Sequence, residues 1–299
     1  MPLLRSYLFA PGNQPKLLDR VFRSGADAVV LDLEDAVPAS EKIAARRLVA
    51  STTNRDQMPG APSASVVGPR VFIRINSTGT DHWRADIDAV VGPGIAGIRI
   101  PKAESLESMC RVHDAVSDRE HALGLPGGSI RLVATIETAR GLNHVQALAT
   151  APRLAGFTFG AADFCADICA DPADPMATLH ACSRLVVASR AGRVAPPVAS
   201  VFTDLHDGAA LRTDTERLKR LGFFGRSAIH PRQVEVINAV FEPTADEVAA
   251  ARDVVSAYET AEQGGSGVTR IGSAFVDLAV VRRARAQLTL SERGGGDRR

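Results

Sequence analysis

RLVATIETAR (residues 131–140) and GFTFGAADF (residues 156–164) are the stretches that decide how this chain folds. In each of them a short apolar run ends in polar residues, and a helical pattern connects the two. Runs that are apolar at every position are typical of strands buried on both faces, as in a parallel sheet. The two stretches therefore predict neighbouring parallel strands, with Glu137 and Asp163 just beyond their carboxyl ends.

The same alternation of strand and helix covers most of the chain. Its count predicts an α/β protein, a (β/α)8 TIM barrel with a C-terminal helical extension, and leaves a doubly wound sheet as the alternative. The expected strands are Ser6–Ala10, Asp27–Leu33, Arg70–Ile75, Gly97–Pro101, Arg131–Ile136, Gly156–Gly160, Val198–Phe202 and Gly225–Ile229. Helices of period 3.6 are expected at Pro15–Ser24, Glu107–Arg119 and Asp207–Leu221. Glycines are expected at helix ends at Gly25, Gly141 and Gly222.

The pattern changes near residue 240, which divides the chain into a catalytic barrel domain, 1–240, and an extension, 241–299. Thr244, with Glu247 three residues on, predicts a capped helix that ends at about Gln263. A glycine-rich loop and a last apolar helix at Phe275–Leu290 follow, before a frayed tail. Earlier in the chain, Gln57–Pro69 is expected to be a surface loop.

Composition excludes several classes of protein. The 299 residues are 45% hydrophobic, and 35 Lys and Arg against 34 Asp and Glu leave a net charge of +1, so no basic excess indicates nucleic-acid binding. No apolar run is long enough for a membrane span, and no signal peptide is evident. The four cysteines form no CxxC pair, and Cys165 and Cys169 are better explained by packing than by zinc binding. We expect a cytoplasmic protein with reduced thiols.

Carboxylates at the strand ends predict a metal site. Chemistry in a TIM barrel takes place where the strands end, and unpaired carboxylates are costly against apolar walls. Mg2+ held by Glu137 and Asp163, with its other positions open to water and substrate, would satisfy both groups. The alternative for each carboxylate is that it caps the helix that follows it.

Other polar side chains follow the second, third and fourth strands. Arg74 can pair with a substrate carboxylate or neutralise an enolate oxygen, or it can form an internal salt bridge with Glu34 or Asp35. We expect Glu34, Asp35 and Lys102 to support the site, although a Schiff-base role for Lys102 stays open. GxGxxG, GxxxxGK[ST] and GxSxG motifs are absent from the sequence, which disfavours Rossmann, P-loop and serine-hydrolase chemistry.

Seven segments, in order, resemble the citrate lyase β-subunit and malyl-CoA lyase family, within the wider HpcH/HpaI aldolase group. They are RSYLFAPG (5–12), LDLEDAVP (31–38), IRIN (73–76), PKAES (101–105), IETARG (136–141), GAADF (160–164) and AIHPRQ (228–233).

The resemblance implies the site residues of this family. It implies a TIM barrel with Mg2+ on Glu137 and Asp163, Arg74 on the acid or enolate, and acyl-CoA against Phe9 and Arg20. It also implies that an acidic residue, here Asp277, reaches the site from a neighbouring subunit, so that 241–299 packs on that subunit in a homotrimer or hexamer.

We therefore expect a Mg2+-dependent carbon–carbon lyase. It would cleave a malyl-, citramalyl- or citryl-CoA type of 3-hydroxyacyl-CoA to acetyl-CoA and a 2-oxo acid. Arg74 and Glu137 would act on the reacting atoms, and Asp277 would move the proton of the acetyl carbon. The alternatives are a β subunit of a multi-protein citrate lyase acting on an acyl-carrier protein, a thioesterase, a bare 2-oxo-acid aldolase, and a binding-only partner subunit.

Overall fold

The computed structural model describes residues 3–53 and 68–296 of the chain. It divides into two compact units, one formed by Leu3–Asn238 and the other by Ala239–Arg299. Most of the loop predicted at Gln57–Pro69 lies outside the described residues.

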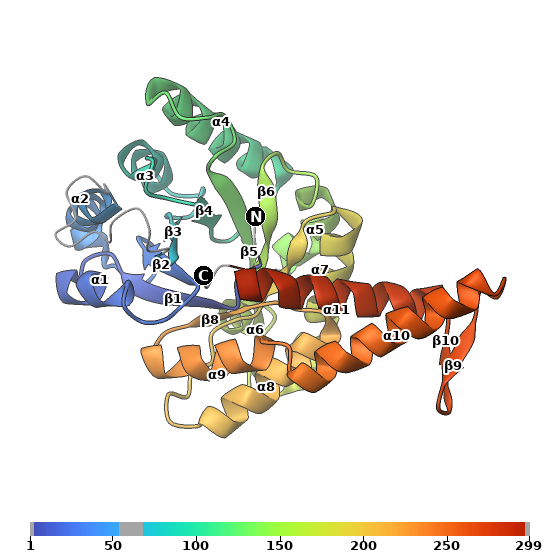
Figure 1. Ribbon diagram of the computed structural model, residues 1–299. Helices are drawn as coiled ribbons and strands as arrows, with labels where there is room; N and C mark the ends of the chain where they lie inside the picture. Colours follow the sequence, from blue (N-terminus) through green and yellow to red (C-terminus); the bar gives the residue numbers. More distant parts are fainter. Residues whose placement is uncertain (1–2, 54–67, 297–299) are drawn as a thin grey trace. The chain divides into compact units, whose positions relative to one another are not determined.

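The first unit is a barrel of eight parallel strands, as predicted (Figure 1). Its strands pair in the order β7-β6-β5-β4-β3-β2-β1-β8, and a bridge between Ala199 and Arg226 links the two ends of this series. Strands β1 to β7 pair with their neighbours in sequence and β8 pairs with β1, as is typical of a chain that alternates strands and helices. The strands are β1 (Ser6–Pro11), β2 (Ala28–Asp32), β3 (Arg70–Arg74), β4 (Gly97–Ile100), β5 (Arg131–Ile136), β6 (Leu154–Phe159), β7 (Ala195–Val198) and β8 (Arg226–Ala228).

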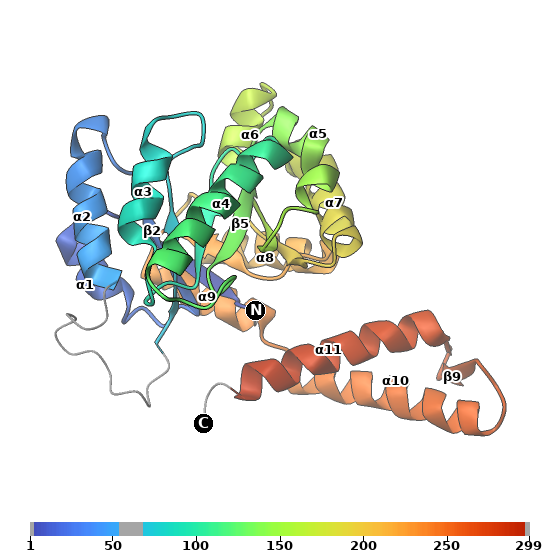
Figure 2. The ribbon, with the colours of Figure 1, turned by 90° about the horizontal axis from the view of Figure 1, so that it is seen from above.

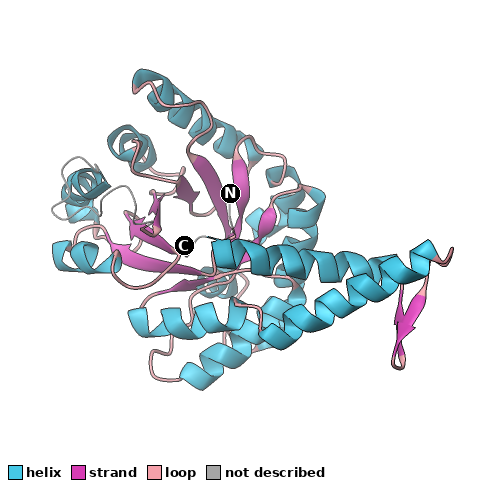
Figure 3. Ribbon diagram, in the orientation of Figure 1, coloured by secondary structure: helices cyan, strands magenta, loops and turns pink. Residues whose placement is uncertain are grey.

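Helices lie outside the strands of the barrel, as Figure 3 shows by colour. The three helices predicted from their periodicity are present as α1, α4 and α8, with ends that differ by up to three residues. The barrel helices are α1 (Pro15–Val21), α2 (Lys42–Thr53), α3 (His82–Val90), α4 (Leu106–Ala122), α5 (Ala139–Leu148), α6 (Ala161–Asp167), α7 (Pro175–Ala191), α8 (Gly208–Leu221) and α9 (Pro231–Phe241), with a 3-10 turn at Ala39–Glu41.

A cluster of apolar side chains fills part of the barrel interior. Its members come from several strands and the segment before β1: Leu4, Tyr7, Ala28, Val30, Phe72, Val133, Ala155 and Val198. The rings of Tyr7 and Phe72 pack at 5.8 Å between centroids, and Phe9 packs against the cluster while staying partly exposed. Burial of these side chains holds the strands in register, and the polar residues described below lie nearer the strand ends.

The seventh strand is not where we predicted it. It spans Ala195–Val198 and ends where the expected strand, Val198–Phe202, begins. Pro196 and Pro197 made this stretch look unlike a central strand, because proline donates no hydrogen bond to the ladder. The barrel tolerates them because the pairing with β6 is irregular here, and the chain joins β8 through Ala199.

The prediction for Gly141 was also wrong. It lies within α5, not at the end of a helix. A Cβ at this position would come within 2.7 Å of the carbonyl oxygen of Ala103, so the glycine allows the start of α5 to approach the loop after β4. Gly222 does end α8 in the left-handed conformation, as expected, and the left-handed Gly25 follows α1.

The second unit is a helical hairpin with a short β-ribbon at its turn (Figure 2). It consists of α10 (Ala245–Gln263), the antiparallel β9 (Thr269–Ile271) and β10 (Ala274–Val276), and α11 (Leu278–Gly296). Thr244 and Glu247 form the predicted capping box. Tyr258, Val276 and Val281 form its buried cluster.

The last helix starts later and ends later than the predicted Phe275–Leu290. Phe275 belongs to the unpredicted β-ribbon, and Asp277 begins α11 by accepting hydrogen bonds from the backbone N–H groups of Ala279 and Val280. The helix runs to Gly296 through part of the segment predicted to be frayed. Among the described helices, none is long and apolar enough to cross a membrane.

Candidate active site

Arg74 sits at the carboxyl end of β3, held by a partner that the sequence analysis did not identify. Its Nε and Nη2 donate to the Oδ1 and Oδ2 atoms of Asp32, each at 2.6 Å, in a bidentate pair between adjacent strands. Burial alone would lower the pKa of Arg74, but the hydrogen bonds and charge of Asp32, with the charge of Glu34, raise it above its ordinary value. Arg74 is therefore a fixed, permanently charged group.

Glu34 lies between two cations. One of its carboxylate oxygens is 3.0 Å from Nη1 of Arg74, and the other accepts a hydrogen bond of 2.8 Å from Nζ of Lys102. Burial raises the pKa of Glu34 to about 7, and the charges of Arg74 and Lys102 oppose that rise without cancelling it. Asp35 is more exposed and lies 3.6 Å from Arg74 and 3.7 Å from Lys102. Both internal salt bridges proposed for Arg74 are thus present.

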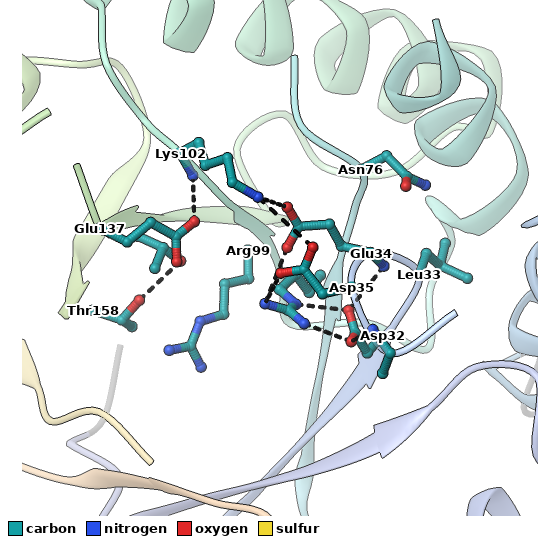
Figure 4. A network of polar contacts seen from close by, with 12 residues as sticks. Asp32, Leu33, Glu34, Asp35, Asn76, Arg99, Lys102, Glu137 and Thr158 are labelled. Atoms are coloured by element: carbon teal, nitrogen blue, oxygen red, sulfur yellow. Dashed lines mark hydrogen bonds and ion pairs between the residues drawn. The ribbon is translucent and has the colours of Figure 1, made fainter. Parts of the chain in front are cut away.

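Lys102 contributes its backbone as well as its side chain. It adopts a left-handed conformation, with φ of 47°, in the turn after β4. That conformation is uncommon for a residue with a side chain. The backbone N–H of Lys102 donates to Oε1 of Glu137 at 2.7 Å. The turn therefore joins the carboxylate at the end of β5 to the charged group around Glu34 (Figure 4).

Glu137 does not cap the helix that follows it. Thr138 does so instead, by accepting a hydrogen bond of 3.0 Å from the backbone N–H of Gly141. The Glu137 side chain is buried, and this burial raises the pKa of its carboxyl, with a smaller contribution from the charge of Asp163. The capping alternative is excluded for Glu137.

Asp163 lies in the first turn of α6 with an exposed side chain, and no described residue hydrogen-bonds to that side chain. It is close enough to Glu137 to raise the pKa of that group. A Cβ at Gly160, which precedes α6, would lie 2.5 Å from Oε2 of Glu137. The glycine thus leaves space beside the buried carboxylate, on the segment that carries Asp163.

These two carboxylates suit a hard divalent cation. Oxygen donors are what Mg2+ prefers, and it usually binds through one or two carboxylates while keeping several waters. Within the described ranges, no group of three or more His, Cys, Asp and Glu side chains could hold a metal ion. A cation at Glu137 and Asp163 would therefore leave positions for water and substrate, and the donor set fits Mg2+.

The remaining predicted residues are Phe9 and Arg20 of the first unit and Asp277 of the second. Phe9 lies in the barrel with the guanidinium carbon of Arg74 5.3 Å from its ring centroid. Arg20 is exposed in the last turn of α1. Asp277 belongs to the second unit, where it caps α11. His230 accepts a hydrogen bond from the backbone N–H of Arg232 in its own loop.

Two polar residues of the site escaped the sequence analysis. Asp32 is the last residue of β2 and Arg99 the last but one of β4, so both belong to the apolar-looking runs AVVLD and GIRI. Residue 32 pairs with 74, and 74 pairs with 99, so the three side chains come from one level of neighbouring strands. The available signal was charge inside a buried strand, since such groups are rarely buried unless paired or functional.

Comparison with known proteins identifies relatives of the chain. Residues 5–231 match the family model described as HpcH/HpaI aldolase/citrate lyase. The citrate lyase subunit beta of Leuconostoc mesenteroides subsp. cremoris is 35% identical over 291 residues, which cover 97% of this chain and 93% of that protein. A (3S)-malyl-CoA thioesterase of Cereibacter sphaeroides is 31% identical over 96% of this chain and 94% of its own length.

A solved structure shares both fold and sequence with the chain. The citrate lyase beta subunit of M. tuberculosis, complexed with oxaloacetate and magnesium, matches with a TM-score of 0.64 and 26% identity. The match covers 81% of this chain and 98% of that one.

Proposed function

We propose a reaction for this chain, which belongs to the HpcH/HpaI aldolase/citrate lyase family and is a lyase of the citrate lyase β-subunit type. It cleaves a 3-hydroxyacyl-CoA to acetyl-CoA and a 2-oxo acid. The observation that carries this proposal is the buried Glu137 carboxylate at the carboxyl end of β5, whose pKa is affected by the charges of Asp163, Arg74 and Lys102. Carboxylates for a metal and a fixed guanidinium are what this cleavage needs.

Glu137 and Asp163 are the residues that would hold Mg2+. When bound, Mg2+ supplies positive charge that polarises the oxygens of the acid part of the substrate. The backbone N–H of Lys102 holds the Glu137 carboxylate in place, at 2.7 Å from Oε1. This contact fixes one donor before any ligand arrives, which lowers the cost of organising the site.

Arg74 is proposed to stabilise the charge that develops during cleavage. The 3-hydroxyl gives its proton to a water molecule that acts as the base, the bond between C2 and C3 breaks, and the electron pair passes to the thioester as an enolate. The C3 oxygen becomes the carbonyl oxygen of the 2-oxo acid. Because Asp32 holds the Arg74 guanidinium through two hydrogen bonds, its positive charge needs no reorganisation as the enolate forms.

Asp277 is proposed to deliver the proton that turns the enolate into acetyl-CoA. The family resemblance supports a role for this group at the site of a neighbouring subunit. The proposal therefore includes an assembly, a homotrimer or hexamer, in which 241–299 packs on the next subunit. Phe9 and Arg20 are proposed to contact the acyl-CoA. A cytoplasmic location stays a prediction.

Two relatives favour second candidates. Similarity to a citrate lyase subunit beta supports an acyl-carrier thioester as the substrate, with the carrier protein as a partner. Similarity to a (3S)-malyl-CoA thioesterase supports hydrolysis of the thioester, with free CoA as a product. The two candidates differ from the main proposal in the thioester that is accepted and in the form in which CoA leaves.

The test is to offer malyl-, citramalyl- and citryl-CoA to the purified protein with Mg2+ and to separate acetyl-CoA from free CoA. Acetyl-CoA from one thioester would support the lyase and name its acyl group. Free CoA with no acetyl-CoA at any time would support the thioesterase. Turnover of a citryl-carrier protein but of none of the CoA esters would support the citrate lyase subunit.

A further inference from the structure

Arg99 is a buried cation, and some of its N–H donors have no hydrogen-bond partner among the described residues. It lies on β4 with 4% of its surface exposed. Its Nη2 donates to Oγ of Ser227 on β8 at 3.1 Å, whereas its Nε and Nη1 have no hydrogen-bond partner in the described structure. Buried polar groups are normally paired, so open donors on a buried guanidinium require an explanation.

No carboxylate of the described residues forms an ion pair with Arg99. Arg74, its neighbour in register, is satisfied by Asp32 and Glu34. Burial, followed by the charge of Arg74, lowers the pKa of Arg99 to about 10, so the group stays a cation at neutral pH. Tyr7 cannot balance this charge, because burial raises the pKa of its phenol far above neutrality.

The open side of Arg99 belongs to the candidate site. The guanidinium carbons of Arg99 and Arg74 lie 4.9 Å and 5.3 Å from the centroid of the same ring, that of the partly exposed Phe9. Figure 4 draws the Arg99 side chain between Glu137 and Asp32, with its guanidinium turned away from Glu34 and Asp35. A small anion that enters beside Phe9 would meet one of the two donor edges of the guanidinium, each of which pairs Nη2 with Nε or with Nη1. Ser227 accepts from one of the two N–H groups of Nη2, so one edge keeps both of its donors open.

We propose that Arg99 binds a carboxylate of the oxo-acid part of the substrate and thereby selects acids with two carboxylates. The other carboxylate would be bound by Arg74 and by the cation at Glu137 and Asp163. This inference rests on the proposed function, since it assigns the two carboxylates of the acid product to two different groups of residues. The edge of the Arg99 guanidinium that Ser227 leaves open presents two N–H donors, one from Nη2 and one from Nε or Nη1, and these match the two oxygens of a carboxylate. The negative charge of the bound carboxylate then balances the positive charge of Arg99, which no described carboxylate of the protein does.

Oxaloacetate and pyruvate form a matched pair of probes, because they differ by one carboxylate. We would measure the binding of each, freshly prepared and with Mg2+ in the buffer, by calorimetry. The protein is expected to bind oxaloacetate more tightly, and Arg99→Met is expected to weaken oxaloacetate binding about tenfold to a hundredfold while changing pyruvate binding less than about threefold. Arg99→Lys keeps the charge but loses the paired donors, and its loss should be intermediate.

The control is Arg111→Met, which removes the same charge from an exposed position on α4, over the ring of Trp83, and should leave both affinities unchanged. Arg99→Met should also melt no lower than the unliganded parent protein, because it removes an unpaired buried charge. Equal weakening of both acids, no weakening, or a parent protein that does not prefer oxaloacetate would each overturn the inference. Absence of acetyl-CoA release with this selectivity intact would instead count against the proposed lyase reaction alone.

Discussion

The barrel interior has two parts that are built on opposite principles. Around Phe72 the side chains are apolar, buried and in mutual contact. At the ends of the strands, Asp32, Glu34, Arg99 and Glu137 are equally buried but charged. The first part stabilises the fold by removing apolar surface from water, and the second costs stability because it removes charges from water. The difference indicates that the charged part is retained for binding and chemistry.

The largest effect is expected at Glu137, and it should appear in activity and not in folding. Glu137→Gln keeps an oxygen that can accept the hydrogen bond from Lys102 but loses the charge needed by a cation. We expect kcat to fall by about 10³ or more, equivalent to ~4 kcal/mol in the barrier, with an unchanged circular dichroism spectrum. Glu104→Gln is the control, since Glu104 accepts from Thr138 at the same rim without belonging to the metal pair. A Glu137→Gln protein with parental kcat would refute the metal assignment.

A substitution at Phe72 is expected to affect folding stability. Phe72→Ala empties a fully buried position that contacts Tyr7, and it should lower the free energy of unfolding by about 3–5 kcal/mol in a denaturant titration. Phe275→Ala, at a position that is 59% exposed, should change it by less than about 0.5 kcal/mol. If both variants unfolded alike, the apolar cluster would not be the source of stability that we assign to it.

A smaller effect on kcat is expected at Asp32, where a matched carboxylate elsewhere in the barrel serves as the control. Asp32→Asn leaves Arg74 without its bidentate carboxylate, and we expect kcat to fall about tenfold to a hundredfold with a smaller change in KM. Asp27→Asn is the matched control, because Asp27 forms a similar pair with Arg5 next to the start of β2. It should reduce stability and leave kcat unchanged. Equal losses of kcat in the two variants would show that Asp32 acts through stability alone.

Glu34 should impose a pH dependence on stability. Its pKa is raised to about 7 in the folded protein from an ordinary 4.5, so folding favours its protonated form. The stabilisation is fully present below about pH 4.5 and is lost as the pH rises through 7. Glu34→Gln removes this dependence, and its stability relative to the parent protein should increase by about 2–3 kcal/mol between pH 5 and pH 8.

Thermal melts across that pH range would measure the effect. Glu107→Gln removes the same charge at an exposed position on α4, and its melting temperature should depend on pH as that of the parent protein does. A constant difference between Glu34→Gln and the parent protein at all pH values would contradict the assignment.

The sequence predicted the barrel well because its strands are short apolar runs with polar ends. Glu137, Asp163 and Arg74 were predicted as site residues for the same reason, as each comes at the end of such a run or just after it. Asp32 and Arg99 were missed because which face of a strand points inward depends on register, which a single strand does not reveal. The seventh strand was misplaced because its prolines are tolerated only through irregular pairing with its neighbours.

The most direct test of the proposed reaction is the balance of its products. From whichever thioester is turned over, acetyl-CoA and 2-oxo acid should appear in equal amounts. Both should cease on addition of EDTA and return with excess Mg2+. Release of CoA without a matching 2-oxo acid, or an unchanged rate in EDTA, would contradict metal-dependent cleavage of a carbon–carbon bond at Glu137 and Asp163.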